Sequence, residues 1–207
     1  MKRTHLLLIG NGEIVFPRLI KSLACQADFV LAVDGGADKA LAAGIVPQGV
    51  IGDLDSVSLS TKRKLAHAII PIATQENTDL EKALSWAVQH HFTDITLVGF
   101  VGDRWDFSIG NLCTLARWAC KLHITVAGDK WRIYPLVKSK QFFCKSHKRV
   151  SLIPLKTCTG VTLTGLAYPL TNARLSLGTT RPLSNITTGT RFKVHFTRGI
   201  LLVYQEV

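Results

Sequence analysis

The sequence has no C-x-x-C pair, and its five cysteines are an odd number. Neither a disulfide framework nor a zinc ribbon is indicated, so a reducing cytoplasm is the expected location. No apolar run is long enough to span a membrane, and the first, Leu6–Ile9, stops at Gly10, short of the core of a secretory signal. With 47% hydrophobic and 19% charged residues, the composition excludes intrinsic disorder. We expect a soluble globular protein.

Familiar nucleotide and metal motifs are also missing. There is no Walker A pattern, no G-x-G-x-x-G and no H-E-x-x-H, so P-loop, dinucleotide-binding and zincin functions have no support. The net charge of +11 lies entirely in residues 129–207, because acidic and basic residues balance in residues 1–128. The basic residues are dispersed among apolar ones and no nucleic-acid motif accompanies them. A solvated basic face is therefore favoured over a nucleic-acid surface.

The first 128 residues alternate short apolar runs with amphipathic segments, which is the pattern of a parallel α/β sheet. The expected strands are Leu6–Ile9, Phe29–Val33, Val50–Ile51, Ile95–Val98 and Ile124–Ala127. The expected helices lie near residues 15–26, 37–43, 60–67, 79–91 and 108–121. The clearest helix start is the capping box Thr78–Glu81. The buried face of that helix is expected to consist of Leu80, Ala83, Leu84, Ala87 and Val88.

After Gly128 the sequence becomes rich in short β-type segments separated by Gly, Pro and Asn. The expected strands contain residues 142–143, 150–153, 161–164, 175–177 and 192–196. This pattern predicts a small antiparallel β-sandwich. We therefore predict an α/β fold in two domains: a Rossmann-like parallel-sheet catalytic domain over residues 1–128, and a β-sandwich over residues 129–207.

Aspartates follow the predicted strands. Asp34 follows the second strand and precedes two glycines, which let the backbone approach a ligand. Asp53 and Asp55 follow the third, and in extended backbone their i, i+2 spacing would place both on the same side. Asp79 lies in the first turn of the capped helix, where the helix dipole favours its charged form. Each aspartate alone could be a turn residue, but together they indicate a ligand site.

A fourth segment, Gly99–Asp106, follows the next predicted strand and contains Arg104, whose guanidinium can bind phosphate through two hydrogen bonds. Open α/β sheets bind ligands at the carboxyl ends of their strands, so we expect the aspartates to converge there. Mg²⁺ binds a few carboxylates together with substrate phosphates. The sequence therefore predicts a magnesium and phosphate site at this edge.

These motifs resemble the thiamine pyrophosphokinase family in order and spacing. In the first half they are Asp34-Gly35-Gly36-Ala37, Gly44 with Pro47, Gly52-Asp53-Leu54-Asp55-Ser56, Gln75-x-x-Thr78-Asp79, Gly102-x-Arg104-x-Asp106 and Asn111. In the second half they are Ser151–Leu155, Thr164–Leu170 and Leu183–Asn185. The resemblance covers nearly the whole chain.

The resemblance implies transfer of the diphosphoryl group of ATP to the hydroxyl of thiamine, with Mg²⁺, giving thiamine diphosphate and AMP. It also implies a homodimer whose active site lies between the α/β domain of one subunit and the β-sandwich of the other. The implied catalytic residues are Asp34, Asp53, Asp55, Asp79, Arg104 and Asp106, of which Asp53, Asp55 and Asp79 bind the metal. The implied ATP contacts are Asp34, Gly35, Gly36, Gln75, Thr78, Arg104 and Asn111. The implied thiamine contacts are Tyr168, Ser184 and Asn185.

The chain departs from the family pattern Gly-Gly-Arg-x-Asp-His at two positions. Asp103 stands in place of the second glycine and Phe107 in place of the histidine. Activity survives this change if the histidine supports the loop, and is slowed if the histidine touches substrate. We expect the loop to pack around Phe107 as an apolar ring, contributing roughly 1.5–3 kcal/mol.

Two other functions would use parts of the sequence. A nucleotide-sugar transferase would use Asp53-Leu54-Asp55 as a D-x-D metal site, but would leave Gln75–Asp79 and the second-half motifs unused. A non-enzymatic nucleic-acid-binding or ligand-sensing protein would use the basic second half and would have lost turnover through Asp103 and Phe107. The four intact aspartates argue against lost catalysis.

Overall fold

The computed structural model describes residues 4–13, 17–72, 76–102 and 104–207. The chain forms two compact units, unit 1 reaching to Asp129 and unit 2 running from Lys130 to Val207. Within the described ranges, no helix is both long and apolar enough to cross a membrane.

Unit 1 is built on a parallel sheet with the strand order β4-β3-β2-β1-β5-β6. Its strands are β1 (His5–Ile9), β2 (Phe29–Val33), β3 (Gly49–Ile51), β4 (Ile69–Ile70), β5 (Asp94–Val98) and β6 (His123–Ala127). The apolar run Leu6–Ile9 forms a central strand, and all four side chains are fully buried. A parallel strand covered on both faces needs a continuous apolar run, which is why this stretch does not alternate with polar residues. The predicted α/β class is confirmed.

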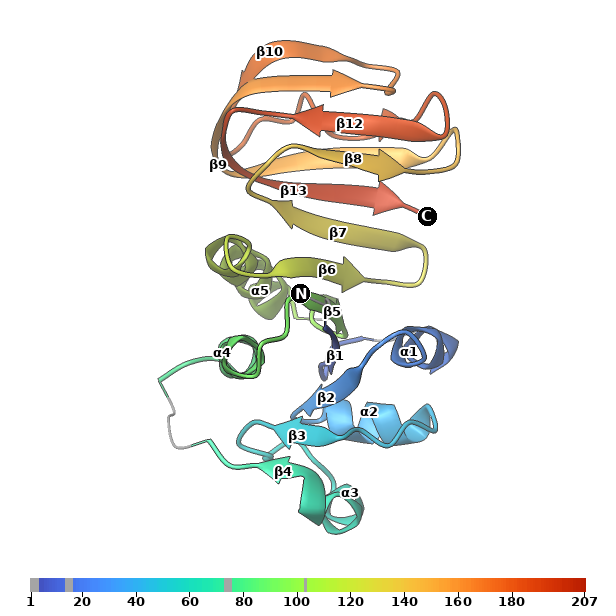
Figure 1. Cartoon of the computed structure of the whole chain (residues 1–207), viewed down its shortest axis with the longest axis vertical. Coiled ribbons are helices and arrows are strands. Elements are labelled where there is room, and N and C mark those ends of the chain that lie inside the picture. Colours follow the sequence, from blue (N-terminus) through green and yellow to red (C-terminus); the bar gives the residue numbers. More distant parts are fainter. Residues whose placement is uncertain (1–3, 14–16, 73–75, 103) are drawn as a thin grey trace. The chain divides into compact units, whose positions relative to one another are not determined.

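Helices cover both faces of this sheet (Figure 1). Helices α1 to α3 lie on one face, and α4 and α5 on the other. They are α1 (Pro17–Ala24), α2 (Gly36–Ala42), α3 (Leu59–Lys64), α4 (Asp79–Gln89) and α5 (Trp105–Trp118), with a short 3-10 turn at Ala66–Ala68. Gly36 lets α2 begin against the end of β1, because a Cβ there would lie 1.9 Å from the carbonyl oxygen of Ile9.

The start of α4 follows the predicted cap. The Thr78 hydroxyl accepts a hydrogen bond from the Glu81 amide at 3.3 Å. The Glu81 carboxylate forms an ion pair with Arg117 of α5 at 2.8 Å, so it joins two helices on the same face of the sheet. The prediction that Val88 is buried is wrong, since its side chain is 37% exposed. Its position in the helical turn places it at the edge of the apolar stripe.

Unit 2 consists of antiparallel strands. They are β7 (Trp131–Leu136), β8 (Lys140–Phe143), β9 (Arg149–Thr164), β10 (Leu170–Leu175), β11 (Asn185–Ile186), β12 (Arg191–His195) and β13 (Arg198–Glu206). The strand β9 belongs to two sheets: its first part pairs with β13 and β11, and its last part with β10 and β12. Side chains from both sheets, among them Leu152, Val203, Leu163 and Phe192, form one core.

The continuity of β9 differs from the sequence-based expectation of two strands at 150–153 and 161–164. Pro154 and Gly160 resemble breaks between strands, yet Pro154 pairs with Leu201 inside the sheet. Gly160 has φ +68° and lies where β9 passes from one sheet to the other. The strand expected at 175–177 ends at Leu175.

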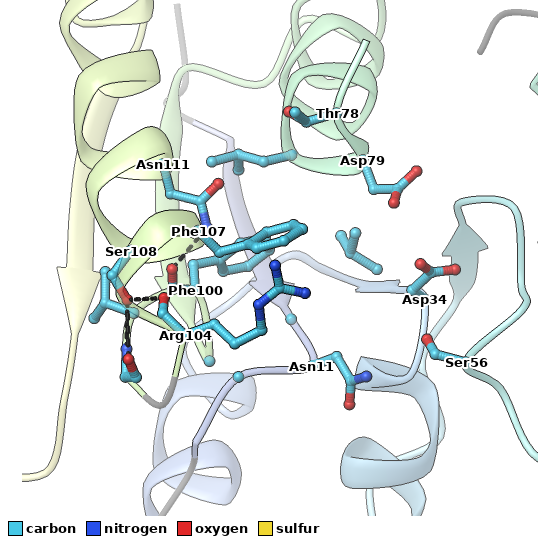
Figure 2. Close-up of a pocket in the computed structure, with 17 residues that line it drawn as sticks. Asn11, Asp34, Ser56, Thr78, Asp79, Phe100, Arg104, Phe107, Ser108 and Asn111 are labelled. Carbon is cyan, nitrogen blue, oxygen red and sulfur yellow. Dashed lines mark hydrogen bonds between the residues drawn. The ribbon is translucent and has the colours of Figure 1, made fainter. Parts of the chain in front are cut away.

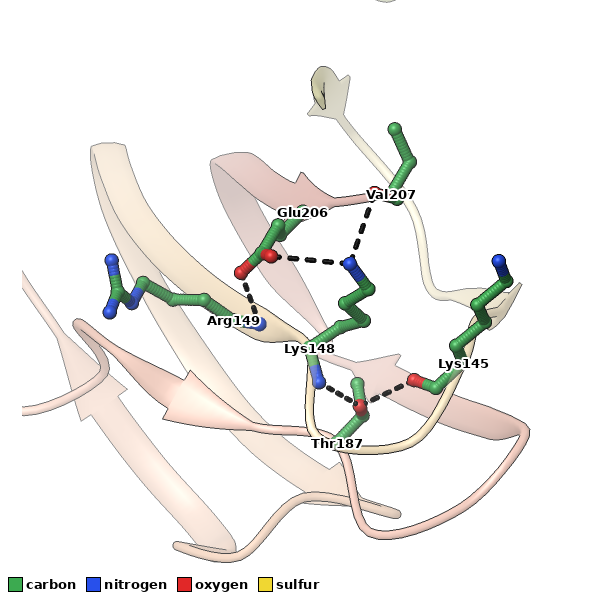
Figure 3. A network of polar contacts seen from close by, with 6 residues as sticks. All are labelled: Lys145, Lys148, Arg149, Thr187, Glu206 and Val207. Atoms are coloured by element: carbon green, nitrogen blue, oxygen red, sulfur yellow. Dashed lines mark hydrogen bonds and ion pairs between the residues drawn. The ribbon is translucent and has the colours of Figure 1, made fainter. Parts of the chain in front are cut away.

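A polar network fastens the end of β13 to the loop before β9 (Figure 3). Lys148 forms an ion pair with Glu206 at 3.2 Å and donates to the Val207 carbonyl at 3.2 Å. Below it, the Thr187 hydroxyl accepts from the Lys148 amide at 2.9 Å and donates to the Lys145 carbonyl at 2.7 Å. The last residues of β13 are thereby fixed to the edge of unit 2.

Candidate active site

A cavity of about 500 Å³ opens at the carboxyl edge of the unit 1 sheet (Figure 2). It is lined by residues that follow β1, β2 and β5 and by the first turns of α4 and α5. This volume lies within the usual range of small-molecule sites, roughly 300–1,000 Å³. The predicted residues that line it are Asp34, Thr78, Asp79, Arg104 and Asn111.

Asp34 follows β2 in a left-handed backbone conformation, with φ 52°. Its amide donates to the Ile51 carbonyl at 2.9 Å, and its Oδ1 accepts from the Leu54 amide at 2.9 Å. Gly52, with φ +138°, leaves room for that carboxylate, because a Cβ there would lie 2.5 Å from Oδ1. One oxygen of Asp34 therefore holds the loop after β3, and the side chain also faces the cavity.

The cavity has a strongly acidic end. Burial, followed by the charges of Asp79 and Asp53, raises the pKa of Asp34 to about 6 against the opposing hydrogen bond from Leu54. Asp79 lies in the first turn of α4 and is paired with Lys82 at 2.9 Å. Carboxylates that repel one another around an open space form a site that favours a bound cation.

The loop carrying Asp53 and Asp55 is not extended, so the prediction that extended backbone places both on one side is wrong. Leu54 has φ 66°, and the Asp55 amide donates to Asp53 Oδ1 at 3.0 Å, closing a tight turn. Both aspartates are exposed, and neither lines the cavity. Among the described residues, no group of three or more potential metal-binding side chains is gathered at one point.

Arg104 and Asp106 lie at the start of α5. The Arg104 side chain donates to both carboxylate oxygens of Asp106, with Nε at 3.2 Å from Oδ1. These hydrogen bonds lower the pKa of Asp106 and raise that of Arg104. Arg104 lines the cavity, whereas Asp106 lies outside its lining.

Phe107 is not packed inside the loop as expected. Its side chain is 53% exposed and lines the cavity, with the Arg104 guanidinium 4.2 Å from its ring centre. The reason is that α5 begins at Trp105, earlier than predicted, so Phe107 lies in the first helical turn. The ring therefore forms part of the cavity wall (Figure 2).

Sequence reasoning missed several cavity residues. Asn11 follows β1 and faces the cavity between Gly10 and Gly12. The only signal for it was the Gly-Asn-Gly segment directly after a strand. Ser108 is buried, accepts from the Gly102 amide at 2.9 Å and donates to the Arg104 carbonyl at 2.9 Å, so it fixes the loop before α5.

The remaining predicted residues of unit 1 lie elsewhere. Gly35 and Gly36 do not line the cavity, although the Gly35 amide donates to the hydroxyl of Ser56, which does. Asn111 also has a structural role, since its side-chain Nδ2 donates to the Phe100 carbonyl at 2.7 Å. Gln75 and Asp103 lie outside the described residues.

The predicted thiamine residues gather in one corner of unit 2. Asn185 is 2% exposed; its Oδ1 accepts from the amides of Tyr168 and Ile186, and its Nδ2 donates to the Tyr168 carbonyl at 2.6 Å. The Tyr168 side chain is 68% exposed. Ser184 is exposed too, in a left-handed conformation with φ 55°. Asn185 therefore fixes the backbone that carries Tyr168.

Comparison with known proteins links both units to one family. Residues 20–126 match the family model for the catalytic domain of thiamin pyrophosphokinase, and residues 138–201 match the model for its vitamin B1 binding domain. The thiamine pyrophosphokinase of Bacillus subtilis is 29% identical over 184 residues, which is 85% of this chain and 86% of that protein.

Solved structures agree with this assignment. The B. subtilis enzyme superposes with a TM-score of 0.85 at 27% identity, covering 99% of both chains. The thiamin pyrophosphokinase of Geobacillus thermodenitrificans gives a TM-score of 0.83 at 28% identity, covering 99% of this chain and 98% of the other. The chain belongs to the thiamine pyrophosphokinase family, enzymes that use ATP to diphosphorylate thiamine.

Proposed function

We propose that the diphosphate transfer takes place in the unit 1 cavity, with the triphosphate of ATP between Arg104 and the carboxylates of Asp34 and Asp79. The observation that carries this proposal is the pairing of opposite charges in one cavity. Arg104 supplies hydrogen-bond donors for phosphate oxygens, and the two aspartates supply the acidic end.

We propose that Mg²⁺ binds at the acidic end. Asp34 and Asp79 face the cavity, and Asp53 is close enough for its charge to raise the pKa of Asp34. This all-oxygen donor set fits Mg²⁺, which keeps several waters and shares its remaining positions with substrate phosphates. Asp55 lies in the same turn as Asp53, is exposed and does not line the cavity. Bound there, Mg²⁺ would neutralise charge on the phosphates.

The reaction that follows is an in-line displacement. The hydroxyl oxygen of thiamine bonds to the β-phosphorus of ATP, the bond from that phosphorus to the oxygen of AMP breaks, and the hydroxyl proton passes to water. The chain's task is to hold both substrates in line and to balance charge, which Arg104 does on the phosphate side. Thr78 and Asn111 line the same cavity and complete the proposed ATP site.

We propose that thiamine binds at the corner of unit 2 formed by Tyr168 and Ser184, with Asn185 holding the backbone of Tyr168. The exposed ring of Tyr168 suits a cationic thiazolium, because a cation is attracted to an aromatic face. We further propose a homodimer in which unit 2 of one subunit completes the cavity of the other, as the resemblance implies.

The test is incubation with ATP, Mg²⁺ and thiamine, followed by chromatography for AMP and thiamine diphosphate. We expect equal amounts of both products, and a loss of at least about 100-fold in Asp34→Asn, because a ligand charge is removed without a change of shape. Asp28→Asn is a matched control at the opposite end of β2, where Asp28 accepts from the His5 amide at 2.8 Å. Near-normal turnover by Asp34→Asn at saturating Mg²⁺ would place the reaction elsewhere.

A further inference from the structure

Arg104 has an exposed side chain that is nevertheless held on two sides. The side chain of Arg104 is 66% exposed, and that of its partner Asp106 is 64% exposed. Arg104 is the N-terminal flanking residue of α5, and Asp106 and Phe107 lie in the first turn of that helix. The helix start therefore brings a carboxylate to two N–H groups of the guanidinium and places the guanidinium over an aromatic ring.

The contact with Asp106 uses only part of the guanidinium. Of the five N–H donors of an arginine, two point at the carboxylate oxygens of Asp106. The donors that remain are available to a phosphate group in the cavity that Arg104 lines. Figure 2 shows the Arg104 side chain extended beside the Phe107 ring toward the middle of the cavity.

An ion pair alone does not fix this geometry. Exposed pairs of this kind contribute little, because water and salt screen them and both side chains lose freedom. The Phe107 ring adds a second contact, with its centre 4.2 Å from the guanidinium carbon. A cation over the face of a ring is attracted to it, so the ring limits swinging of the guanidinium about its contact with the carboxylate.

We propose that Phe107 is a positioning residue for ATP: its ring holds the Arg104 guanidinium in the place from which the remaining N–H donors reach the phosphates. This inference rests on the proposed role of Arg104 in the transfer. It assigns Phe107 an action through Arg104 and no direct contact with the base of ATP or with thiamine.

The experiment is a double-mutant cycle on the full-length chain, using Arg104→Met, Phe107→Leu and the double variant. Phe107→Leu keeps an apolar side chain and removes the π face, and Phe107→Tyr restores the face. We expect Phe107→Leu to raise the KM for ATP about threefold with little change in kcat or in the KM for thiamine, the size expected of one exposed cation–π contact. Phe107→Tyr should match the unmodified chain, and Arg104→Met should raise the KM for ATP more than about tenfold.

The decisive result is the effect of Phe107→Leu when Arg104 is already methionine. If the KM for ATP then stays the same, the result supports positioning through Arg104. An equal rise in both backgrounds means that the ring contacts ATP directly, and it overturns the inference, as does an unchanged KM in Phe107→Leu. If Arg104→Met itself leaves the KM for ATP unchanged, the proposed phosphate role of Arg104 fails instead. Calorimetry of ATP binding shows that the differences in KM reflect binding, and melting temperatures show that each variant is folded. If Phe107→Leu does not fold, Phe107→Ala takes its place.

Discussion

Asp34 and Asp79 come from different elements of unit 1, one at the end of β2 and the other in the first turn of α4, yet the charge of Asp79 raises the pKa of Asp34. After burial, the charge of Asp79 is the largest cause that raises the pKa of Asp34 to about 6. Bringing these two charges together opposes folding and favours binding of a cation. In the proposed active site, stability and activity therefore conflict.

The first prediction follows from this conflict. In metal-free protein, Asp34→Asn should raise the free energy of unfolding by about 1 kcal/mol at pH 8, after allowance for water around a half-buried carboxylate. Because the pKa of Asp34 is raised in the folded state, the unmodified chain loses stability as the pH rises from about 4 to about 6, and the variant does not. Urea unfolding at pH 4 and pH 8 with a chelator measures the difference. If Asp34→Asn raises the free energy of unfolding equally at both pH values, Asp34 does not have a raised pKa in the folded chain.

A second prediction concerns Asp38, which ties α2 to α3. Its Oδ2 accepts from the Ser58 amide at 2.9 Å, and its Oδ1 accepts from the hydroxyls of Ser58 and Thr61 at 2.5 and 2.7 Å. Burial acts to raise the pKa of Asp38, but these hydrogen bonds outweigh it and lower the pKa. The carboxylate thus stabilises the fold above its ordinary pKa of about 4, and the contribution disappears as the pH falls through its lower folded value.

Asp38→Asn should therefore cost about 1–2 kcal/mol at pH 7 and less at pH 3. Chemical denaturation at the two pH values gives the comparison. Ser60→Ala is the control, since it removes a hydroxyl from α3 that contacts Ser58 at 3.1 Å without touching Asp38. If the two variants are equally stable at pH 7, the carboxylate is not what joins the helices.

The third prediction tests Asn11, the cavity residue that the sequence did not reveal. Asn11→Ala should weaken ATP binding about twofold to tenfold, the value of one hydrogen bond, and leave the melting temperature unchanged because the side chain is exposed. Isothermal calorimetry with a nonhydrolysable ATP analogue measures the affinity. Gln89→Ala, at the far end of α4, removes an exposed carboxamide away from the cavity and should have no effect. If the unmodified chain, Asn11→Ala and Gln89→Ala bind the ATP analogue equally well, Asn11 is not part of the ATP site.

The fourth prediction tests the shared site of the proposed homodimer. A chain with Asp79→Asn and a chain with Tyr168→Ala and Ser184→Ala should each be inactive. Mixed after subunit exchange, they should recover about a quarter of normal activity, because half of the dimers are hybrids and each hybrid holds one intact site. Exchange is verified by native mass spectrometry. Verified hybrids without activity would mean that each subunit completes its own site.

The sequence was sufficient to predict the elements whose cause is local. The apolar run Leu6–Ile9, the cap at Thr78 and the position of Asp34 after β2 all depend on neighbouring residues and are found where expected. The orientation of Phe107 was not predictable, because it depends on the residue at which α5 begins. That helix has no side-chain cap at Arg104 to mark its start.

Other features depend on contacts between distant residues. The continuity of β9 through Pro154 is determined by its pairing with Leu201 of β13, 47 residues later in the chain. The turn at Leu54 depends on the Asp34 carboxylate, which accepts from its amide. Asn11 becomes a cavity residue only because β1 lies at the centre of the sheet, between β2 and β5.

The position of β13 has a consequence for synthesis on the ribosome. This strand lies between β7 and β9, and its Leu201 and Val203 belong to the unit 2 core, yet it follows all the other strands of that unit in the chain. The nascent chain can complete the unit 1 sheet while unit 2 is still being translated, whereas the unit 2 core stays open until residue 206 has emerged. During that interval β7 and β9 lack the strand that joins them, and chaperone binding would protect their edges.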